Sequence, residues 1–472
     1  MQKTAVKEKI TGKKFLVLGL GKTGLSVAKQ LSHLGAEITV NDGKATPMTD
    51  EMKALADQYA VTFVLGEHPL SLLDQPFDAV IKNPGIPYTH PMIEKATALA
   101  LPIITDVEVA GWLSDAMIIG ITASNGKTTT SALTAKILSE SLLSGETRLG
   151  GNIGIPSLDI ALDATAADRL VLELSSFQLQ GTTTFHPHIA ALMNLYPTHL
   201  DYHGTMSDYL QAKWHITANQ TASDYLLLNA DQPLLWEKRT ETKATIIPIS
   251  LTHPCVDPIG AWYDETNKTL NWGSEVVSER ANLALPGDHN VQNALNAIAV
   301  AKLLQVDNAT IQRVLQQFRG VKHRIQWVGD FEQRSFYNDS KATNNEAALT
   351  ALNSFERPIV WIAGGLNRHI PLTELKPAVK KHVKALVVMG ENAPEFESLA
   401  KACGITTIEH ADWVEDAVKK AYTFSAAGDV ILLSPASASW DQYPSFEVRG
   451  DRFIAAVEQF TTQQDMTTEG DH

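Results

Sequence analysis

Cysteine is nearly absent from this chain, which has only Cys255 and Cys403 among its 472 residues. Two cysteines so far apart exclude a disulfide framework and a cysteine zinc site, and they favour a reducing, cytoplasmic location. Long apolar runs are also lacking, because no stretch approaches the roughly 18 residues that a membrane-spanning helix needs. The lysine-rich N terminus leads into the short apolar run FLVLGL, which predicts a strand and not a signal peptide.

Positive charge is in short supply. The chain has 39 lysines and arginines against 53 aspartates and glutamates, a formal net charge of −14. No basic excess is available to neutralise phosphates, so non-specific binding to nucleic acid is not expected. An acidic protein that binds an anionic nucleotide must rely on local devices such as helix N-termini, bound metals and a few placed cations.

Strand-like and helix-like segments alternate almost throughout, which predicts an α/β fold with parallel sheets. We expect three domains: a Rossmann-like domain over residues 1–105, a P-loop ATPase-like central domain over 106–320 and a Rossmann-like C-terminal domain over 321–472. The central strands are nearly continuously apolar, as sheets covered on both faces require. Residues 252–285 are rich in turn formers and predict a β insertion, and the third domain opens with a predicted hairpin over 324–339.

The first glycine-rich stretch is GLGKTG, residues 19–24, between a predicted strand and a predicted helix. This G-x-G-x-x-G spacing is typical of a dinucleotide site, in which the helix N-terminus faces a diphosphate. One interpretation is a nicotinamide-dependent dehydrogenase, with Asp42 on the ribose. Another is that the diphosphate belongs to a different nucleotide.

The second glycine-rich stretch is GITASNGKTTT, residues 120–130, which also joins a strand to a helix. Backbone N–H groups there would face a phosphate, Lys127 would reach the β- and γ-phosphates, and Thr128 would offer a hydroxyl to Mg²⁺. The match is imperfect, because five residues separate Gly120 from Gly126 and Ile121 takes a usual glycine position. The alternative is a strand–turn–helix junction with no ligand.

Candidate metal ligands follow two of the central strands. Glu173 ends a buried strand, where an unpaired carboxylate is costly, so a cation should accompany it; a salt-bridged or solvent-exposed glutamate is the alternative. His199, Asp201 and His203 alternate after another strand, and an extended backbone would put them on one side; an ordinary polar loop is the alternative. Lys213 shares the apolar side of its helix with Tyr209, and the residues alone favour a lysine that reaches out to water.

Two further polar clusters lie near the boundary of the third domain. The first turn of a predicted helix holds His289, Asn290 and Asn293, which could meet a purine or ribose or could cap the helix. The run around NDSKATN contributes Arg324, Asp339, Lys341 and Thr343. That run suggests a ligand site, with a solvated loop as the alternative.

These stretches, together with GGNIGIP and YLQAKWHI, occur in an order that resembles the Mur ligases, the ATP-dependent amino-acid ligases of peptidoglycan synthesis. Folylpolyglutamate synthases share part of the set. GLGKTG, NPGIP at 83–87 and SPASASWDQYPSFEVRG at 434–450 resemble the member that adds D-glutamate to UDP-N-acetylmuramoyl-L-alanine. The resemblance implies that GLGKTG holds the diphosphate of UDP and that Asp42 helps to hold the uridine end.

The resemblance also implies residue roles. ATP would be bound by Ser124, Asn125, Gly126, Lys127, Thr128, Thr129, Asn293, Arg324 and Asp339. The UDP substrate would be bound by Gly21, Lys22, Thr23, Asp42, Asn83, Gly85, Asn152 and Ser175. D-glutamate would be bound by Thr343, Arg368, Ser439 and Phe446, with Lys341 among the catalytic residues alongside Lys127, Glu173, His199 and Lys213. Two Mg²⁺ ions would be held by Thr128, Glu173, His199 and a carbamate formed on Lys213 by CO₂.

The chain departs from the family pattern at two places. Ala123 stands where a glycine is usual in the phosphate loop, and alanine allows less backbone freedom. Arg368 is followed by His369 in AGGLNRHIPL, where related enzymes carry a lysine or arginine beside a glycine.

We expect a monomeric ligase that activates the alanyl carboxylate as an acyl phosphate, with no nucleic acid partner. The competing hypotheses are a dehydrogenase, a sibling Mur ligase or folylpolyglutamate-type ligase that adds another amino acid, and a nucleotide-gated module without enzymatic activity.

Overall fold

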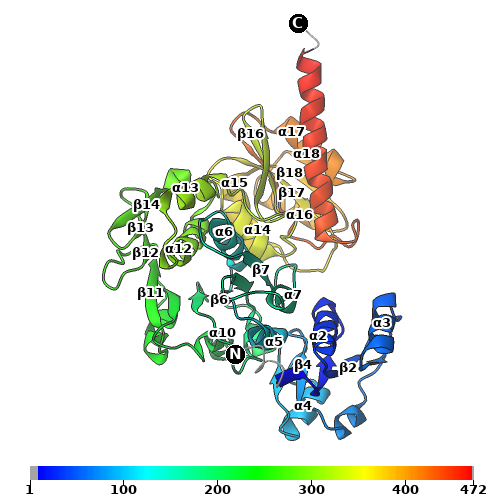
Figure 1. The fold of residues 1–472 in the computed structure, drawn as a ribbon. Helices are drawn as coiled ribbons and strands as arrows, with labels where there is room; N and C mark the ends of the chain where they lie inside the picture. The colour runs from blue at the N-terminus through cyan, green and yellow to red at the C-terminus, as the bar shows by residue number, and fades with distance from the viewer. Residues whose placement is uncertain (1–8, 470–472) are drawn as a thin grey trace. The chain divides into compact units, whose positions relative to one another are not determined.

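We describe the fold from a computed structural model, which describes residues 9–469. The chain forms two compact units: residues 1–283 with 291–316, and residues 284–290 with 317–472. The first unit contains two sheets and the second contains one (Figure 1). The three-part α/β fold predicted from the sequence is therefore confirmed. The domain limits stay a prediction, although every sheet falls inside one predicted range.

The first sheet is parallel and has five strands in the order β3-β2-β1-β4-β5. Its strands are Lys14–Leu18 (β1), Glu37–Asp42 (β2), Val61–Leu65 (β3), Ala79–Lys82 (β4) and Ile103–Ile104 (β5). Its helices are Lys22–His33 (α2), Asp50–Gln58 (α3) and Pro91–Ala98 (α4). The strands at its two edges are β3 and the two-residue β5.

The second sheet has nine strands in the order β14-β13-β12-β11-β10-β9-β6-β8-β7. Its parallel strands are Met117–Thr122 (β6), Thr147–Gly151 (β7), Arg169–Glu173 (β8), Ile189–Leu192 (β9), Tyr225–Asn229 (β10) and Thr245–Ser250 (β11). The predicted insertion is an antiparallel meander of Ala261–Asp264 (β12), Thr269–Trp272 (β13) and Glu275–Glu279 (β14). Its helices are Asp106–Leu113 (α5), Lys127–Ser139 (α6), Ser157–Ala161 (α7), Ser176–Leu179 (α8), Leu200–His203 (α9), Met206–Trp214 (α10), Pro233–Trp236 (α11), Asp288–Leu303 (α12) and Asn308–Gln317 (α13).

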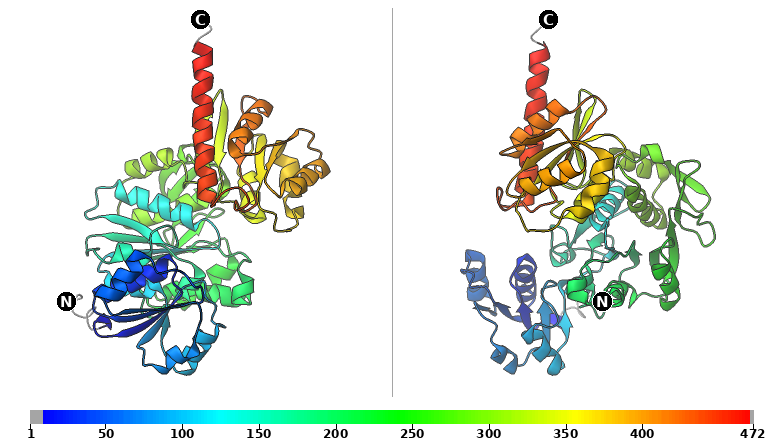
Figure 2. Two further views of the ribbon diagram at one scale, coloured as in Figure 1. Left: turned by 90° about the vertical axis from the view of Figure 1, so that its right-hand side faces the viewer. Right: turned by 180° about the vertical axis from the view of Figure 1, so that it is seen from behind.

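The third sheet has six strands in the order β15-β16-β20-β17-β18-β19 and opens with the predicted hairpin. Its strands are Gln326–Phe331 (β15), Arg334–Asn338 (β16), Ile359–Gly364 (β17), Val383–Met389 (β18), Ile408–His410 (β19) and Val430–Leu433 (β20). Its helices are Asn345–Leu352 (α14), Lys376–His382 (α15), Ala393–Ala402 (α16), Val414–Phe424 (α17) and Phe446–Glu469 (α18). Helix α18 runs on past its own sheet toward the C terminus (Figure 2).

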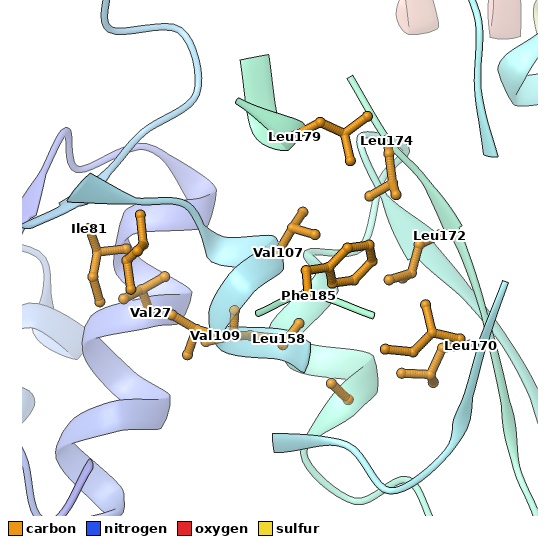
Figure 3. Close-up of a cluster of buried hydrophobic side chains, with 14 of the residues drawn as sticks. Val27, Ile81, Val107, Val109, Leu158, Leu170, Leu172, Leu174, Leu179 and Phe185 are labelled. Carbon is orange, nitrogen blue, oxygen red and sulfur yellow. The ribbon is translucent and has the colours of Figure 1, made fainter. Parts of the chain in front are cut away.

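One hydrophobic core runs through the first unit. Val109 of α5 lies near Val27 and Ile81, which belong to the layers of the first sheet (Figure 3). On its other side the same core continues into Leu170 and Leu172 of β8. Residues of the first two sheets and their helices thus belong to one continuous hydrophobic core.

Among residues 9–469, no helix is both long enough and apolar enough to cross a membrane.

Candidate functional site

The predicted phosphate loop joins β6, which ends at Thr122, to α6, which begins at Lys127. Gly126 precedes the helix in the left-handed region, with φ of 84°. A Cβ on Gly126 would lie 2.2 Å from Oδ1 of Asn293. Glycine suits this position because it adopts a positive φ without strain and has no Cβ to collide with Asn293. The backbone amides before α6 can therefore face a ligand. Ala123 has no positive φ, so alanine in place of the family's glycine leaves the loop geometry intact.

Replacing Gly126 with alanine is expected to weaken ATP binding, because the new methyl group must displace Asn293 or distort the loop. We expect the KM for ATP to rise by about tenfold or more, as a steric and backbone cost of 1–3 kcal/mol implies. Gly329→Ala is the control, since no atom lies within 4 Å of its Cβ position. An unchanged KM for ATP in the Gly126 variant would contradict this role of the glycine.

The side chains of the loop are held by groups from elsewhere in the unit. Ser124 Oγ lies 3.1 Å from the hydroxyl of Tyr209 and donates to the carbonyl of Tyr196. The N–H of Asn125 donates to Oδ1 of Asn194 at 3.0 Å, and the Asn194 amide donates back to the Asn125 carbonyl at 3.1 Å. The sequence analysis missed Asn194, although a buried polar residue directly after a core strand was an available signal.

Lys127 lies on the first turn of α6 and folds back over its own loop. Its Nζ donates to the carbonyls of Ala123 at 2.7 Å and Ser124 at 2.9 Å. Thr129 follows on the same turn and is half-buried. Thr130 donates to Oδ1 of Asn293 at 3.2 Å, which brings that predicted nucleotide residue beside the loop.

Glu173 at the end of β8 is 2% exposed, and no lysine, arginine or histidine within the described chain forms an ion pair with it. Thr128 Oγ1 donates to Oε2 at 2.7 Å and Asn152 Nδ2 donates to Oε1 at 2.9 Å. The alternatives of a salt-bridged or solvent-exposed glutamate are therefore wrong. A buried carboxylate beside a phosphate-loop hydroxyl is a donor set that fits Mg²⁺, which prefers one or two carboxylates plus substrate phosphates.

Lys213 on α10 is 1% exposed, so the interpretation of a lysine reaching out to water is wrong. Its Nζ donates to the Ala123 carbonyl at 2.8 Å and lies 4.7 Å from the centre of the Tyr209 ring. Burial lowers the pKa of Lys213 well below its ordinary value; the nearby Lys127 charge lowers it further and Glu173 opposes both. Lys213 and Lys127 thus meet at one carbonyl of the phosphate loop.

The segment after β9 has no regular structure up to His199 and is helical from Leu200 to His203, so the expectation of an extended backbone over 199–203 is wrong. His199 precedes α9 with φ of 56°, and His203 lies four residues on, which puts both on one helical face. Both rings contact Phe177, at centroid distances of 5.1 Å and 5.2 Å. Nε2 of His203 hydrogen-bonds Ser176 Oγ at 2.9 Å, and the side chain of Asp201 lies outside the described residues. Within the described set, no group of three or more His, Cys, Asp or Glu side chains forms a metal cluster.

The GLGKTG loop folds as its glycines predict. A Cβ on Gly24 would lie 2.0 Å from the Gly19 carbonyl, and α2 begins at Lys22, so Gly21 precedes it and Thr23 lies on its first turn. Asp42 caps this loop: Oδ2 accepts the N–H of Leu20 at 2.7 Å. Burial would raise the pKa of Asp42, but hydrogen bonds from backbone N–H groups outweigh it and lower the pKa.

Three other residues assigned to the UDP substrate are placed as follows. Asn83 lies against the glycine loop, because a Cβ built on Gly19 would be 2.7 Å from the Cβ of Asn83. Gly85 donates its N–H to Asn83 Oδ1 at 3.2 Å. Ser175 caps α8 in a reciprocal pair with Gln178, which is a structural role of its own.

In the second unit, Asp339 is buried at the end of β16. Burial raises the pKa of Asp339 to about 7. Two hydrogen bonds act in the opposite direction and lower the pKa: Ser434 Oγ donates to the carboxylate at 2.8 Å, and the N–H of Ile325 donates to it as well. Arg324 is half-buried and its charge also acts on Asp339. Lys341 Nζ lies 4.5 Å from the centre of the Phe446 ring, so these two predicted residues come together.

The remaining predicted residues of the amino-acid site also lie in the second unit. Ser439 is buried, and within the described part of the chain its hydroxyl has no hydrogen-bond partner. Thr343 donates its N–H to the Lys341 carbonyl. The guanidinium of Arg368 lies 5.0 Å from the centre of the Trp440 ring.

The sequence analysis missed Arg449, which is buried at the start of α18. Its guanidinium donates to Ser340 Oγ at 3.0 Å and to the carbonyls of Ser340 and Ser437. Burial lowers the pKa of Arg449 to about 10. The stretch SPASASWDQYPSFEVRG contains this arginine, but its residues alone do not show that the side chain is buried.

These features define a three-part α/β protein with a phosphate loop in its central part. Family models match all three parts: "Mur ligase MurD-like, N-terminal domain" over residues 13–105, "Mur ligase middle domain" over 121–301 and "Mur ligase, glutamate ligase domain" over 323–437. The chain belongs to the Mur ligase family. This membership removes the dehydrogenase hypothesis for GLGKTG.

Relatives and solved structures agree with that family. The UDP-N-acetylmuramoylalanine–D-glutamate ligase of Lactiplantibacillus plantarum is 47% identical over 96% of this chain and 98% of its own. The enzyme of the same name from Enterococcus hirae is 48% identical, over 96% of this chain and 97% of its own. The MurF ligase of Thermotoga maritima in complex with ADP shares the fold, with a TM-score of 0.54, 17% identity and coverage of 97% of both chains.

Proposed function

We propose that this chain joins D-glutamate to UDP-N-acetylmuramoyl-L-alanine at the expense of ATP, in peptidoglycan precursor synthesis. The observation that carries the proposal is the likeness to relatives named as D-glutamate ligases, at 47% and 48% identity over nearly the whole chain. The three domains would be residues 1–105 for the UDP substrate, 106–320 for ATP and 321–472 for the amino acid. We further propose a cytoplasmic monomer.

The reaction has two steps. The alanyl carboxylate attacks the γ-phosphorus of ATP, which forms an acyl phosphate and releases ADP. The amine of D-glutamate then attacks the acyl carbon, the tetrahedral intermediate collapses, the nitrogen loses a proton and inorganic phosphate leaves. Both steps bring anions together, so the protein must supply positive charge and alignment.

The residues of the first unit match the first step. The amides before α6 and the Lys127 ammonium would bind the phosphates of ATP, and Asn293 would contact the nucleotide from beside the loop. Thr128 and Glu173 would hold one Mg²⁺, and His199 with a carbamate on Lys213 would hold a second. Bound Mg²⁺ would neutralise charge on the transferred phosphoryl group. Arg324 and Asp339, which belong to the second unit, are further nucleotide-binding residues that the sequence resemblance implies.

The residues of the second unit match the second step. Arg368, Thr343 and Ser439 would bind the carboxylates of D-glutamate, because a guanidinium and hydroxyls are suitable donors. The unpartnered buried hydroxyl of Ser439 supports this role, since such a group costs free energy unless a ligand accepts its hydrogen bond. Lys341 and Phe446 would line the same pocket.

The test is phosphate release from ATP in the presence of UDP-N-acetylmuramoyl-L-alanine and one amino acid at a time. We expect D-glutamate to stimulate release at least a hundredfold over L-glutamate, because a site built for one enantiomer leaves buried polar groups unpaired with the other. L-alanine, L-lysine and meso-diaminopimelate serve as the comparison set.

Two results would contradict the proposal. Stimulation by another amino acid would identify a sibling ligase. ATP binding without amino-acid-dependent phosphate release would identify a nucleotide-gated module.

A further inference from the structure

Lys82, the last residue of β4, is 1% exposed although it carries an ammonium group. Within the described chain no carboxylate forms an ion pair with it. Its Nζ donates instead to three carbonyl oxygens of a single turn: Asn83 at 3.3 Å, Pro84 at 3.1 Å and Ile86 at 2.7 Å. Burial lowers the pKa of Lys82 to about 8, so this placement is costly. An ammonium used in this way fixes the shape of the turn.

The turn that Lys82 holds is part of the proposed UDP-substrate site. Asn83 packs against Gly19 and lies 3.2 Å from the Cβ position of Gly21, so the turn and the GLGKTG loop form one surface. The N–H of Gly85 is already committed to Asn83 Oδ1. The conformation of this turn therefore decides which groups face a ligand on the glycine loop.

The Lys82 ammonium also contacts α9, one of the helices of the second sheet. Its Nζ donates to the hydroxyl of Tyr202 at 3.4 Å, and that hydroxyl donates to the Ile86 carbonyl at 3.2 Å. Tyr202 lies on α9, three residues after His199, and Phe177 packs edge-on against both rings, at 4.5 Å and 5.1 Å. A chain of direct contacts thus joins the 83–86 turn to α9, which His199, a candidate metal ligand, immediately precedes.

We propose that Lys82 is a positioning residue that closes the 83–86 turn around the UDP substrate and couples it, through Tyr202, to the short helix beside the reacting end. This inference rests on the proposed function for the identity of the substrate. Lys82 does not touch the reacting atoms. It acts through the turn, whose shape holds the substrate and aligns it with the phosphate loop.

The test is Lys82→Met, which keeps the volume of the side chain and removes the donor. We expect the Kd for UDP-N-acetylmuramoyl-L-alanine, measured by calorimetry without ATP or D-glutamate, to rise roughly tenfold or more, as loss of a charged donor implies. The Kd for ATP should stay within about twofold, because in the described part of the chain the Lys82 hydrogen bonds go to the 83–86 turn and to Tyr202, not to the phosphate loop. In turnover, the KM for the UDP substrate should rise by a similar factor.

Tyr202→Phe tests the coupling and serves where Lys82→Met does not fold. It removes one hydroxyl, so we expect about a threefold rise in the Kd for the UDP substrate, and little further rise when both changes are combined. Lys95→Met is the matched control. The Lys95 ammonium also donates to a backbone carbonyl, that of Leu70 at 2.9 Å, but it lies at the surface and pairs with Asp74.

Two results would overturn the inference: an unchanged affinity for the UDP substrate in both variants, or an equal loss of affinity for UDP substrate and ATP. Calorimetry separates this inference from the proposed function. A wild-type chain that binds the UDP substrate but releases no phosphate with D-glutamate would contradict the function alone, and the comparison of variants would still decide the role of Lys82.

Discussion

Lys127→Met is expected to lower kcat about a thousandfold, the scale at which removal of a placed cation affects phosphoryl transfer. Negative charge moves onto the oxygens of the transferred phosphoryl group, and methionine cannot attract it. The ammonium now donates to the carbonyls of Ala123 and Ser124, which keeps it over the loop where a phosphate would bind. Phosphate release under saturating substrates measures the effect.

Lys136→Met is the matched control for this experiment. Lys136 lies on the same helix, α6, but is half exposed and forms a surface ion pair with Glu140. Surface pairs of this kind contribute little, so activity and melting temperature should stay close to wild type. A Lys127 variant as active as the Lys136 variant would contradict the phosphate-loop assignment, and a Lys127 variant that loses its fold would show a structural role instead.

The α/β fold could be predicted because its signals are local. Apolar strands alternate with helices along the chain, and each sheet assembled inside one predicted range. Some edge strands have weak local signals: β7 (TRLGG) ends in two glycines, and β3 (VTFVL) is half exposed. Such strands owe their structure to pairing with β8 and β2, which the residues themselves do not reveal.

In the candidate site too, residues with a local signal could be predicted and residues that depend on distant partners could not. The phosphate loop was predictable because its residues are consecutive and its glycine must adopt a left-handed conformation. Asn194 was missed because its role depends on Asn125, 69 residues away in the chain. The segment from His199 to His203 was misjudged as extended, although helical spacing still places the two histidines on one face.

Arg449 and Lys82 show a further limit of sequence reasoning. Both are cations that the fold buries against backbone carbonyls instead of carboxylates. Nothing in the neighbouring residues marks such a cation, because a carbonyl partner leaves no trace in the identity of a side chain. Buried cations of this kind become visible only when the turns that they hold are known.

Lys213 is the residue for which sequence and structure differ most. The pattern of its helix favoured a lysine reaching out to water, whereas its partner is the Ala123 carbonyl, 90 residues away in the chain. Because burial and Lys127 lower the pKa of Lys213, more of its amine is neutral near pH 7 than for an exposed lysine. A neutral amine can add to CO₂: the nitrogen–carbon bond would form, a proton would leave, and an anionic carbamate would stand beside Lys127.

Lys213→Ala is therefore expected to lose at least a hundredfold in kcat, because the proposed second Mg²⁺ would lack an anionic ligand. Millimolar acetate or propionate should restore part of this activity, since a short carboxylate can occupy the space left by the side chain and supply the same charge. Lys127→Met should gain nothing from carboxylates, because an anion cannot replace an ammonium. The measurement is kcat against carboxylate concentration in both variants, with melting temperature to confirm folding. Wild-type activity in Lys213→Ala would exclude the carbamate, and a folded variant that no carboxylate restores would show that the amine itself is what the reaction needs.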